Sequence, residues 1–335
     1  MEESIGLELP GKRGSKYRLE SYLGGGQTAH VYLATVIEDA NDQRKNVSVA
    51  VKMMQAGLDP DTQRRFWQEE TVLHRLASGL QSREGQGQRL VPAVWDSGDS
   101  MGGGFLVMTL AQGQPLDELL RMGIEWSEDD ALHLIEQLTA IFRSLHTVLQ
   151  RTYLDFQPRN IFWHAESRSI CVIDWNLLSR SYAASEGEVS ATQPNAARTA
   201  YGKDLLVIAR LLYRMLLGSE PLGLSKLDVA APERWKQLSQ SMRILLWDLL
   251  EPESVYLNDG VKFKERIDEE ISNRRGPGDS LLKKVNDLIE RSEKVDTPRQ
   301  KMDLRERASG LLELAEQKGL NRAWTRILEN LREIL

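Results

Sequence analysis

Three oxygen-bearing side chains lie in two short segments whose spacing would bring them to one point. Asp155 and Asn160 begin and end the segment Asp-Phe-Gln-Pro-Arg-Asn, and Asp174 ends the apolar run Ile-Cys-Val-Ile-Asp. Residues 161–163 and 171–173 have the pattern of a β-hairpin with a polar turn. Residues opposed in a hairpin lie about 5 Å apart, so an amide oxygen and a carboxylate would emerge together at its open end. Mg²⁺ binds such oxygens together with phosphate oxygens, so the pattern predicts a phosphoryl-transfer site with metal ligands Asn160 and Asp174.

The loop before this hairpin carries two further candidates. Asp155 lies five residues upstream of Asn160 and can approach the same point without binding the metal. That is the place of a catalytic base or of a group that orients the nucleophile. Arg159 is either a surface charge or a bidentate partner of the transferring phosphate. Each acidic or amide residue alone also fits an ordinary turn or cap, and the joint occurrence favours the site.

A second charged pair is expected nearer the start of the chain. Glu69 falls on the helical stripe shared with Phe66, Leu73 and Leu76, so its carboxylate should face the core. A buried charge without a partner costs several kcal/mol, which is the order of the free energy lost when one partner of a buried ion pair is removed. Lys52, at the end of the strand 47–52, is the natural partner, and Glu70 is the alternative to Glu69.

The glycine cluster Gly24, Gly25 and Gly26 joins two alternating segments, 17–23 and 31–36. Glycine supplies the positive φ of any tight hairpin turn, which is the simpler interpretation. The functional interpretation is a loop whose backbone N–H groups approach phosphate oxygens.

The remaining pattern predicts an α+β protein, with strands first and helices after Gln112. Further strands are expected at 90–94 and 105–108, and helices at 61–76, 127–145, 203–217, 239–250 and 280–335, the last broken near 297–298 and 319. Loops are expected at 79–88, 97–104 and 179–199.

Composition limits the partners and the cellular location that we expect. The 335 residues carry a net charge of -6, which argues against a nucleic-acid partner. The single cysteine, Cys171, lies in an apolar strand pattern and is expected to be a buried thiol in a reducing compartment. No run of about 18 apolar residues occurs and the acidic start lacks a signal-like segment, so we expect no membrane partner and a cytoplasmic location.

Taken together, residues 15 to 252 resemble the eukaryotic-type (Hanks, Ser/Thr) protein kinases. The segments that carry the resemblance follow the family's order: the glycine loop 23–31, Val-Ala-Val-Lys at 49–52, the helix glutamate in 66–69, the hinge in 106–113, the catalytic loop 153–160, Ile-Asp-Trp-Asn at 173–176 and a helix that opens with Asp204.

The resemblance implies a bilobal protein-kinase-like fold, with a small antiparallel sheet lobe that carries one helix and a larger, mainly helical lobe. It implies ATP and Mg²⁺ as cofactors, with Asp155, Lys52 and Arg159 as catalytic residues. It implies further that Met108 is a gatekeeper and that Lys52 and Glu69 hold the phosphates. The remaining nucleotide contacts that it implies are Gly24, Gly25, Gly26, Val31, Ala50, Thr109, Leu110, Ala111 and Phe162.

Several positions depart from the family pattern. Tyr153 and Leu154 replace the His-Arg that precedes the catalytic aspartate, so activity should not depend on a phosphate in the activation loop. Trp175 and Asn176 replace Phe-Gly, which restricts loop flipping. No Ala-Pro-Glu motif ends the activation segment, between Asp174 and the helix that opens with Asp204.

We therefore predict an ATP-dependent protein Ser/Thr kinase that phosphorylates a protein substrate and its own segment 179–199. The expected domains are an N-lobe at 1–111, a C-lobe at 112–255 and a helical C-terminal extension at 256–335. Two alternatives remain open: a small-molecule kinase similar to aminoglycoside or choline kinases, and a nucleotide-binding pseudokinase scaffold. The apolar residues of the extension should pack on the C-lobe, or else dock a partner or a second copy.

Overall fold

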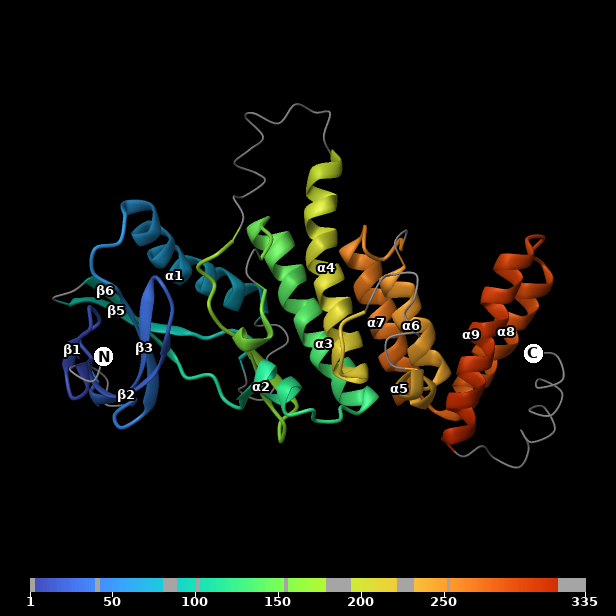
Figure 1. Cartoon of the computed structure of the whole chain (residues 1–335), viewed down its shortest axis with the longest axis horizontal. Coiled ribbons are helices and arrows are strands. Elements are labelled where there is room, and N and C mark those ends of the chain that lie inside the picture. Colours follow the sequence, from blue (N-terminus) through green and yellow to red (C-terminus); the bar gives the residue numbers. More distant parts are fainter. Residues whose placement is uncertain are drawn as a thin grey trace. The chain divides into compact units, whose positions relative to one another are not determined.

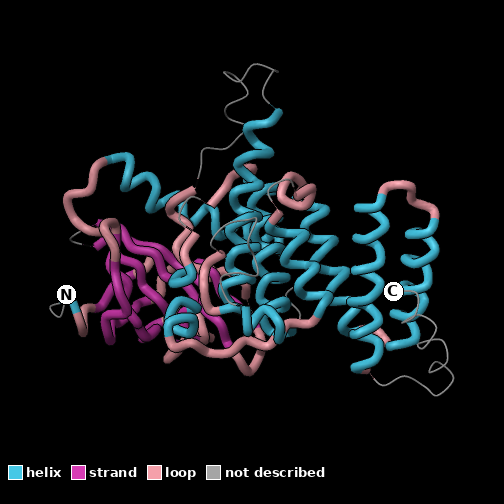
Figure 2. The backbone as a smooth tube through the Cα atoms, turned by 45° about the vertical axis from the view of Figure 1, so that its right-hand side comes forward, coloured by secondary structure: helices cyan, strands magenta, loops and turns pink. Residues whose placement is uncertain are grey.

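The chain is described by a computed structural model in the ranges 4–39, 43–80, 89–100, 103–153, 156–178, 194–221, 232–251 and 254–318. It divides into two compact units, Met1–Met122 with Ala140–Thr192 and Gly123–Thr139 with Gln193–Leu335. All the described strands belong to the first unit (magenta in Figure 2), and the second is helical. The protein is therefore a mixed α and β structure with antiparallel sheets. The division into lobes and an extension stays a prediction.

The larger sheet of the first unit has six antiparallel strands in the order β1-β2-β3-β4-β6-β5. Their bounds are β1 (Glu8–Pro10), β2 (Lys16–Gly25), β3 (Ala29–Glu38), β4 (Ser48–Met54), β5 (Val94–Ser100) and β6 (Gly103–Thr109). The two edges approach each other after β1, where the Lys12 N–H donates to Ser97 O at 2.8 Å. Alternate residues such as Val49, Val51 and Val107 face the core of this sheet and are completely buried.

Helix α1 (Pro60–Leu80) packs on this sheet, since Phe66 shares a buried cluster with Ala29 and Leu106 (Figure 1). A short helix α2 (Leu116–Arg121) lies in the chain between the first and the second strand of a second strand set. That set is a three-stranded sheet, β7-β8-β9, with bounds β7 (Gln114–Pro115), β8 (Ile161–His164) and β9 (Ser169–Val172). The register pairs Ile161 with Val172, so the predicted hairpin is confirmed.

The second unit consists of α4 (Pro194–Leu217), α5 (Pro232–Gln237), α6 (Gln240–Leu250), α7 (Gly260–Arg275), α8 (Gly278–Glu293) and α9 (Pro298–Gln317), with the start of α3 (Glu128–Ser144). Helices α8 and α9 pair through a cluster of their own, including Leu282, Val285, Leu312 and Ala315. Helix α9 also packs on α6, because Gly310 allows close approach to the backbone of Ser241.

Three expectations about elements were wrong. The strand at 90–94 is irregular up to Ala93, because Pro92 has no N–H for a ladder. The loop at 97–104 is strand at 97–100 and 103–104, since its Gly98 packs against the ring of Phe105 rather than marking a turn.

The loop at 179–199 is helical from Pro194, a residue favoured at the first position of a helix. Residues 179–193 of that segment, and residue 319 at the predicted tail break, lie outside the described residues. Helices α2, α5 and α7 were missed from the sequence.

Among the helices in the described part of the chain, none combines the length and apolarity needed to cross a membrane.

Candidate functional site

Lys52 is the centre of the candidate site. Its Nζ lies 2.6 Å from Glu69 Oε2 and 2.8 Å from Asp174 Oδ1. Both partners in the Lys52–Glu69 pair are buried, with exposed fractions of 6% and 1%. The predicted pair is thus present, and the prediction from the helical stripe that Glu69 rather than Glu70 is the partner is confirmed.

The charge of Lys52 is retained in this environment. Burial lowers the pKa of the ammonium group, but the carboxylates of Glu69 and Asp174 outweigh burial and hold the pKa above the ordinary lysine value of 10.5. Because the pKa of Lys52 is higher in the folded than in the unfolded state, the protonated lysine stabilises the fold. This contribution is fully present below the unfolded-state pKa. This contribution is lost as the pH rises through the folded-state value, so the network is intact at neutral pH.

Asp174 follows β9 with its backbone in the left-handed region, at φ 65°. This conformation is uncommon outside glycine, although Asp tolerates it better than most residues. It turns the chain so that the carboxylate reaches Lys52 across 122 residues of sequence. Strained backbone of this kind is retained where neighbouring groups hold it.

Those neighbours are Tyr153 and Trp175. The Tyr153 hydroxyl lies 2.8 Å from Asp174 O and 3.1 Å from Ile173 O, and its ring stacks on Trp175 with centroids 4.9 Å apart. The Trp175 indole N–H donates to Val172 O at 2.8 Å, while its backbone N–H donates to Glu69 Oε1 at 3.0 Å. Glu69 therefore joins Lys52 to the Asp174 segment through both of its oxygens.

Asn160 lies beside this segment as the hairpin predicts. The Ile173 N–H donates to Asn160 O at 2.9 Å, and Asn160 Nδ2 lies 3.5 Å from the Tyr153 hydroxyl, a weak contact. The side chain is 6% exposed, and its Oδ1 accepts no hydrogen bond from any described residue. An amide oxygen that accepts no hydrogen bond from a described residue is available as a ligand.

The glycine loop connects β2 to β3. A Cβ at Gly25 would lie 2.6 Å from the Tyr22 hydroxyl and 2.7 Å from His30 Nδ1, so both side chains would have to move to admit one. Gly24 has φ 154°. The loop residue Thr28 is linked to the Asp174 segment, since Asn176 Nδ2 lies 3.4 Å from Thr28 Oγ1.

The predicted nucleotide contacts lie on neighbouring strands. Register pairs Val31 with Lys52 and Ala50 with Met108, so these four share one face of the sheet. The predicted hinge begins at the end of β6, and its residues are half-buried: Thr109, Leu110 and Ala111. Phe162 is half-buried on β8, two residues after Asn160.

Asp155 and Leu154 lie outside the described residues, so the role of Asp155 stays a prediction. Arg159 is described and exposed. Cys171 is buried, which raises the pKa of its thiol to about 12 and makes it an inert core residue as predicted.

Sequence reasoning missed the joint role of Tyr153 and Trp175. Both were noted as departures from a pattern, but their stacking needs a contact between segments about twenty residues apart. The signal available was the presence of an aromatic residue just before the 155–160 loop and of another just after the hairpin.

No metal-binding group of three or more His, Cys, Asp or Glu side chains occurs among the described residues. No family model matches the sequence, and no curated protein matches it.

Proposed function

We propose that the protein is an ATP- and Mg²⁺-dependent kinase with a protein-kinase-like fold, acting on Ser or Thr of a protein. The observation that carries the proposal is the contact of buried Lys52 with both Glu69 and Asp174. A lysine ammonium has three N–H donors. Two of them are used by these carboxylates, and the third is available for a phosphate oxygen of the nucleotide.

The side chains around Lys52 fit a magnesium ion. Asn160 offers its Oδ1, and Asp174, which binds Lys52 through Oδ1, can offer its Oδ2. Mg²⁺ is usually held by one or two protein oxygens together with phosphate oxygens and water, so a larger acidic cluster is not needed. When bound there, the ion would neutralise phosphate charge.

The chain's own residues would do the remaining work. Tyr153 and Trp175 hold the Asp174 backbone in its left-handed turn, and Glu69 fixes the position of Lys52. Asp155 would orient the acceptor hydroxyl and accept its proton. The glycine loop would cover the phosphates with backbone N–H groups.

Incubation with γ-labelled ATP and Mg²⁺ tests the proposal. We expect transfer to the protein itself or to a generic protein acceptor, and a loss of about 100-fold or more in Asp174→Asn and Asp155→Asn. Lys16→Met is a matched control, because Lys16 is an exposed lysine paired with Glu38 on the same sheet. Undiminished transfer by both aspartate variants would contradict the assigned roles.

The acceptor class is tested in the same assay. Phosphopeptide mapping of 179–199 reports transfer to the chain itself, while polyamine, sugar and aminoglycoside acceptors report small-molecule transfer. Labelling of small molecules alone would replace the protein acceptor by that class.

Thermal unfolding with ATP separates binding from chemistry. A ligand that binds the native state raises the melting temperature, and we expect a larger rise with Mg²⁺ than without it. A shift without transfer to any acceptor would reduce the proposal to a nucleotide-binding scaffold.

A further inference from the structure

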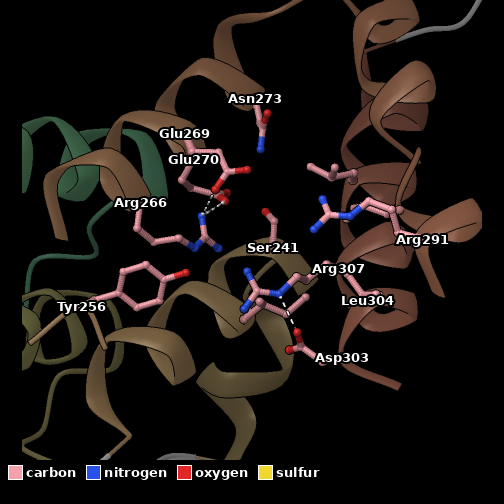
Figure 3. A pocket seen from close by; sticks show the side chains of 13 residues that line it. Ser241, Tyr256, Arg266, Glu269, Glu270, Asn273, Arg291, Asp303, Leu304 and Arg307 are labelled. Atoms are coloured by element: carbon pink, nitrogen blue, oxygen red, sulfur yellow. Dashed lines mark hydrogen bonds and ion pairs between the residues drawn. The ribbon is translucent and has the colours of Figure 1, made fainter. Parts of the chain in front are cut away.

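A pocket lies in the helical unit, among α6, α7, α8 and α9 (Figure 3). Its volume is about 270 Å³, enough for a small molecule. Three arginines from three helices line it, namely Arg266 of α7, Arg291 of α8 and Arg307 of α9.

Arg266 is buried with most of its donors unused. The side chain is 6% exposed and its Nε donates to Asp248 Oδ2 at 2.8 Å. Its Nη1 lies 3.6 Å from Glu269 and 3.7 Å from Glu270, beyond hydrogen-bond distance. No other partner exists for this guanidinium within the described chain. The Nη groups line the pocket and can donate to acceptor atoms placed there.

Two neutral donors face the same space. Asn273 is 3% exposed, and its Oδ1 accepts from Lys284 Nζ at 2.6 Å, which fixes the orientation of the amide. Its Nδ2 points into the pocket and has no acceptor among the described residues (Figure 3). The Tyr256 hydroxyl also points into the pocket, where it interacts electrostatically with Arg307 and makes no hydrogen bond to a described residue.

The two other arginines complete the donor set. Arg307 donates from Nε to Asp303 and from Nη2 to Asp248, which leaves Nη1 unused. The exposed Arg291 points inward in Figure 3 and is 3.9 Å from Asp287, its nearest carboxylate.

Carboxylates line the pocket as well, but most are already engaged. Glu270 accepts from Arg274 at 2.9 Å and Asp303 accepts from Arg307 at 3.1 Å. Glu269 is half-exposed at the rim and has no hydrogen bond, so it can accept one from a ligand hydroxyl.

We propose that this pocket binds a small hydroxylated phosphate monoester. Donors that come from α7, α8, α9 and the turn before α7 approach from different directions, which a tetrahedral group with several acceptor oxygens satisfies better than a planar one. The ligand's hydroxyls meet Glu269, and its carbon skeleton meets Leu288 and Leu304.

Calorimetric titration of the full chain with glycerol 3-phosphate tests the site, with inorganic phosphate and glycerol as the two partial ligands. We expect saturable binding of glycerol 3-phosphate, weaker binding of phosphate and none of glycerol. Tyr256→Phe and Arg291→Gln should each raise the dissociation constant about tenfold, since each removes one donor to a charged group.

Arg299→Gln is the matched control, because Arg299 is an exposed arginine on α9 paired with Glu251 outside the pocket. Lys52→Met distinguishes this pocket from the proposed nucleotide site and should leave the binding of glycerol 3-phosphate unchanged. Circular dichroism confirms that each variant is folded. The proposal would be overturned if the wild type showed no saturable binding, or if both pocket variants bound glycerol 3-phosphate as tightly as the wild type.

Discussion

At the scale of single residues, Lys52 contributes to stability through its buried ion pair with Glu69 and also to the proposed phosphate transfer. Replacing Lys52 by Met leaves the carboxyl group of Glu69 almost completely buried and without its ion-pair partner. We expect the free energy of unfolding to fall by about 3–5 kcal/mol, the usual cost of one partner lost from a buried ion pair. Urea denaturation measures this. Lys16→Met, an exposed change on the same sheet, should leave the urea midpoint almost unchanged.

The double variant Lys52→Met with Glu69→Leu separates the contribution to stability from the contribution to phosphate transfer. Replacing both members of a buried pair by apolar residues is often nearly neutral. We therefore expect most of the lost stability to return while phosphate transfer does not. A double variant as unstable as the single one, or one that regains transfer, would show that the pair does not act as described.

Tyr153→Phe removes one hydroxyl and keeps the stacking on Trp175. The carbonyl of Asp174 then loses its side-chain donor, and the left-handed turn loses a restraint. We expect about a tenfold loss of transfer with a loss of stability of about 1 kcal/mol. Tyr22→Phe provides a comparison at an exposed tyrosine, and equal effects of the two changes would argue against a positioning role.

At the scale of elements, residue patterns within a short stretch of sequence predicted the features that depend on that stretch alone. The stripe that contains Glu69 gave the orientation of α1, and alternation around a polar turn gave the β8–β9 hairpin. The signals at Pro92 and Pro194 are local and were misread, because proline cannot donate to a β-ladder and is favoured at the first position of a helix. Gly98 belongs to a strand only because Phe105 packs against it, and that contact is not visible in a local window.

The packing of α9 on α6 depends on Gly310. A Cβ there would lie 3.1 Å from Ser241 N and 3.3 Å from Ser241 Cα, backbone atoms that cannot rotate away. We expect Gly310→Val to lower the free energy of unfolding by about 1–3 kcal/mol through overpacking. Gly260→Ala is the matched control, because no atom lies within 4 Å of the added Cβ. Both are measured by thermal unfolding, and equal midpoints would contradict this packing.

At the scale of the molecule, the candidate site and the helical pocket belong to different units, each with its own buried charges. Asp248 joins α6 to Arg266 of α7 and Arg307 of α9, at 2.8 and 2.7 Å. Motif spacing predicted the pairing of Lys52 with Glu69, whereas this cluster carries no such signal. Its members lie up to 59 residues apart on helices whose pairing only the fold defines.

Asp248→Asn should destabilise the second unit by about 3–5 kcal/mol, because two guanidinium groups lose a carboxylate that is mostly buried. Changes at sites that share no partners normally add to within about 0.5 kcal/mol. We therefore expect calorimetry to show that Lys52→Met and Asp248→Asn lower different transitions and that their combination lowers both. MgATP should raise the transition that Lys52→Met lowers and leave the other unchanged. A single transition lowered by either change would mean that the two units unfold as one cooperative block.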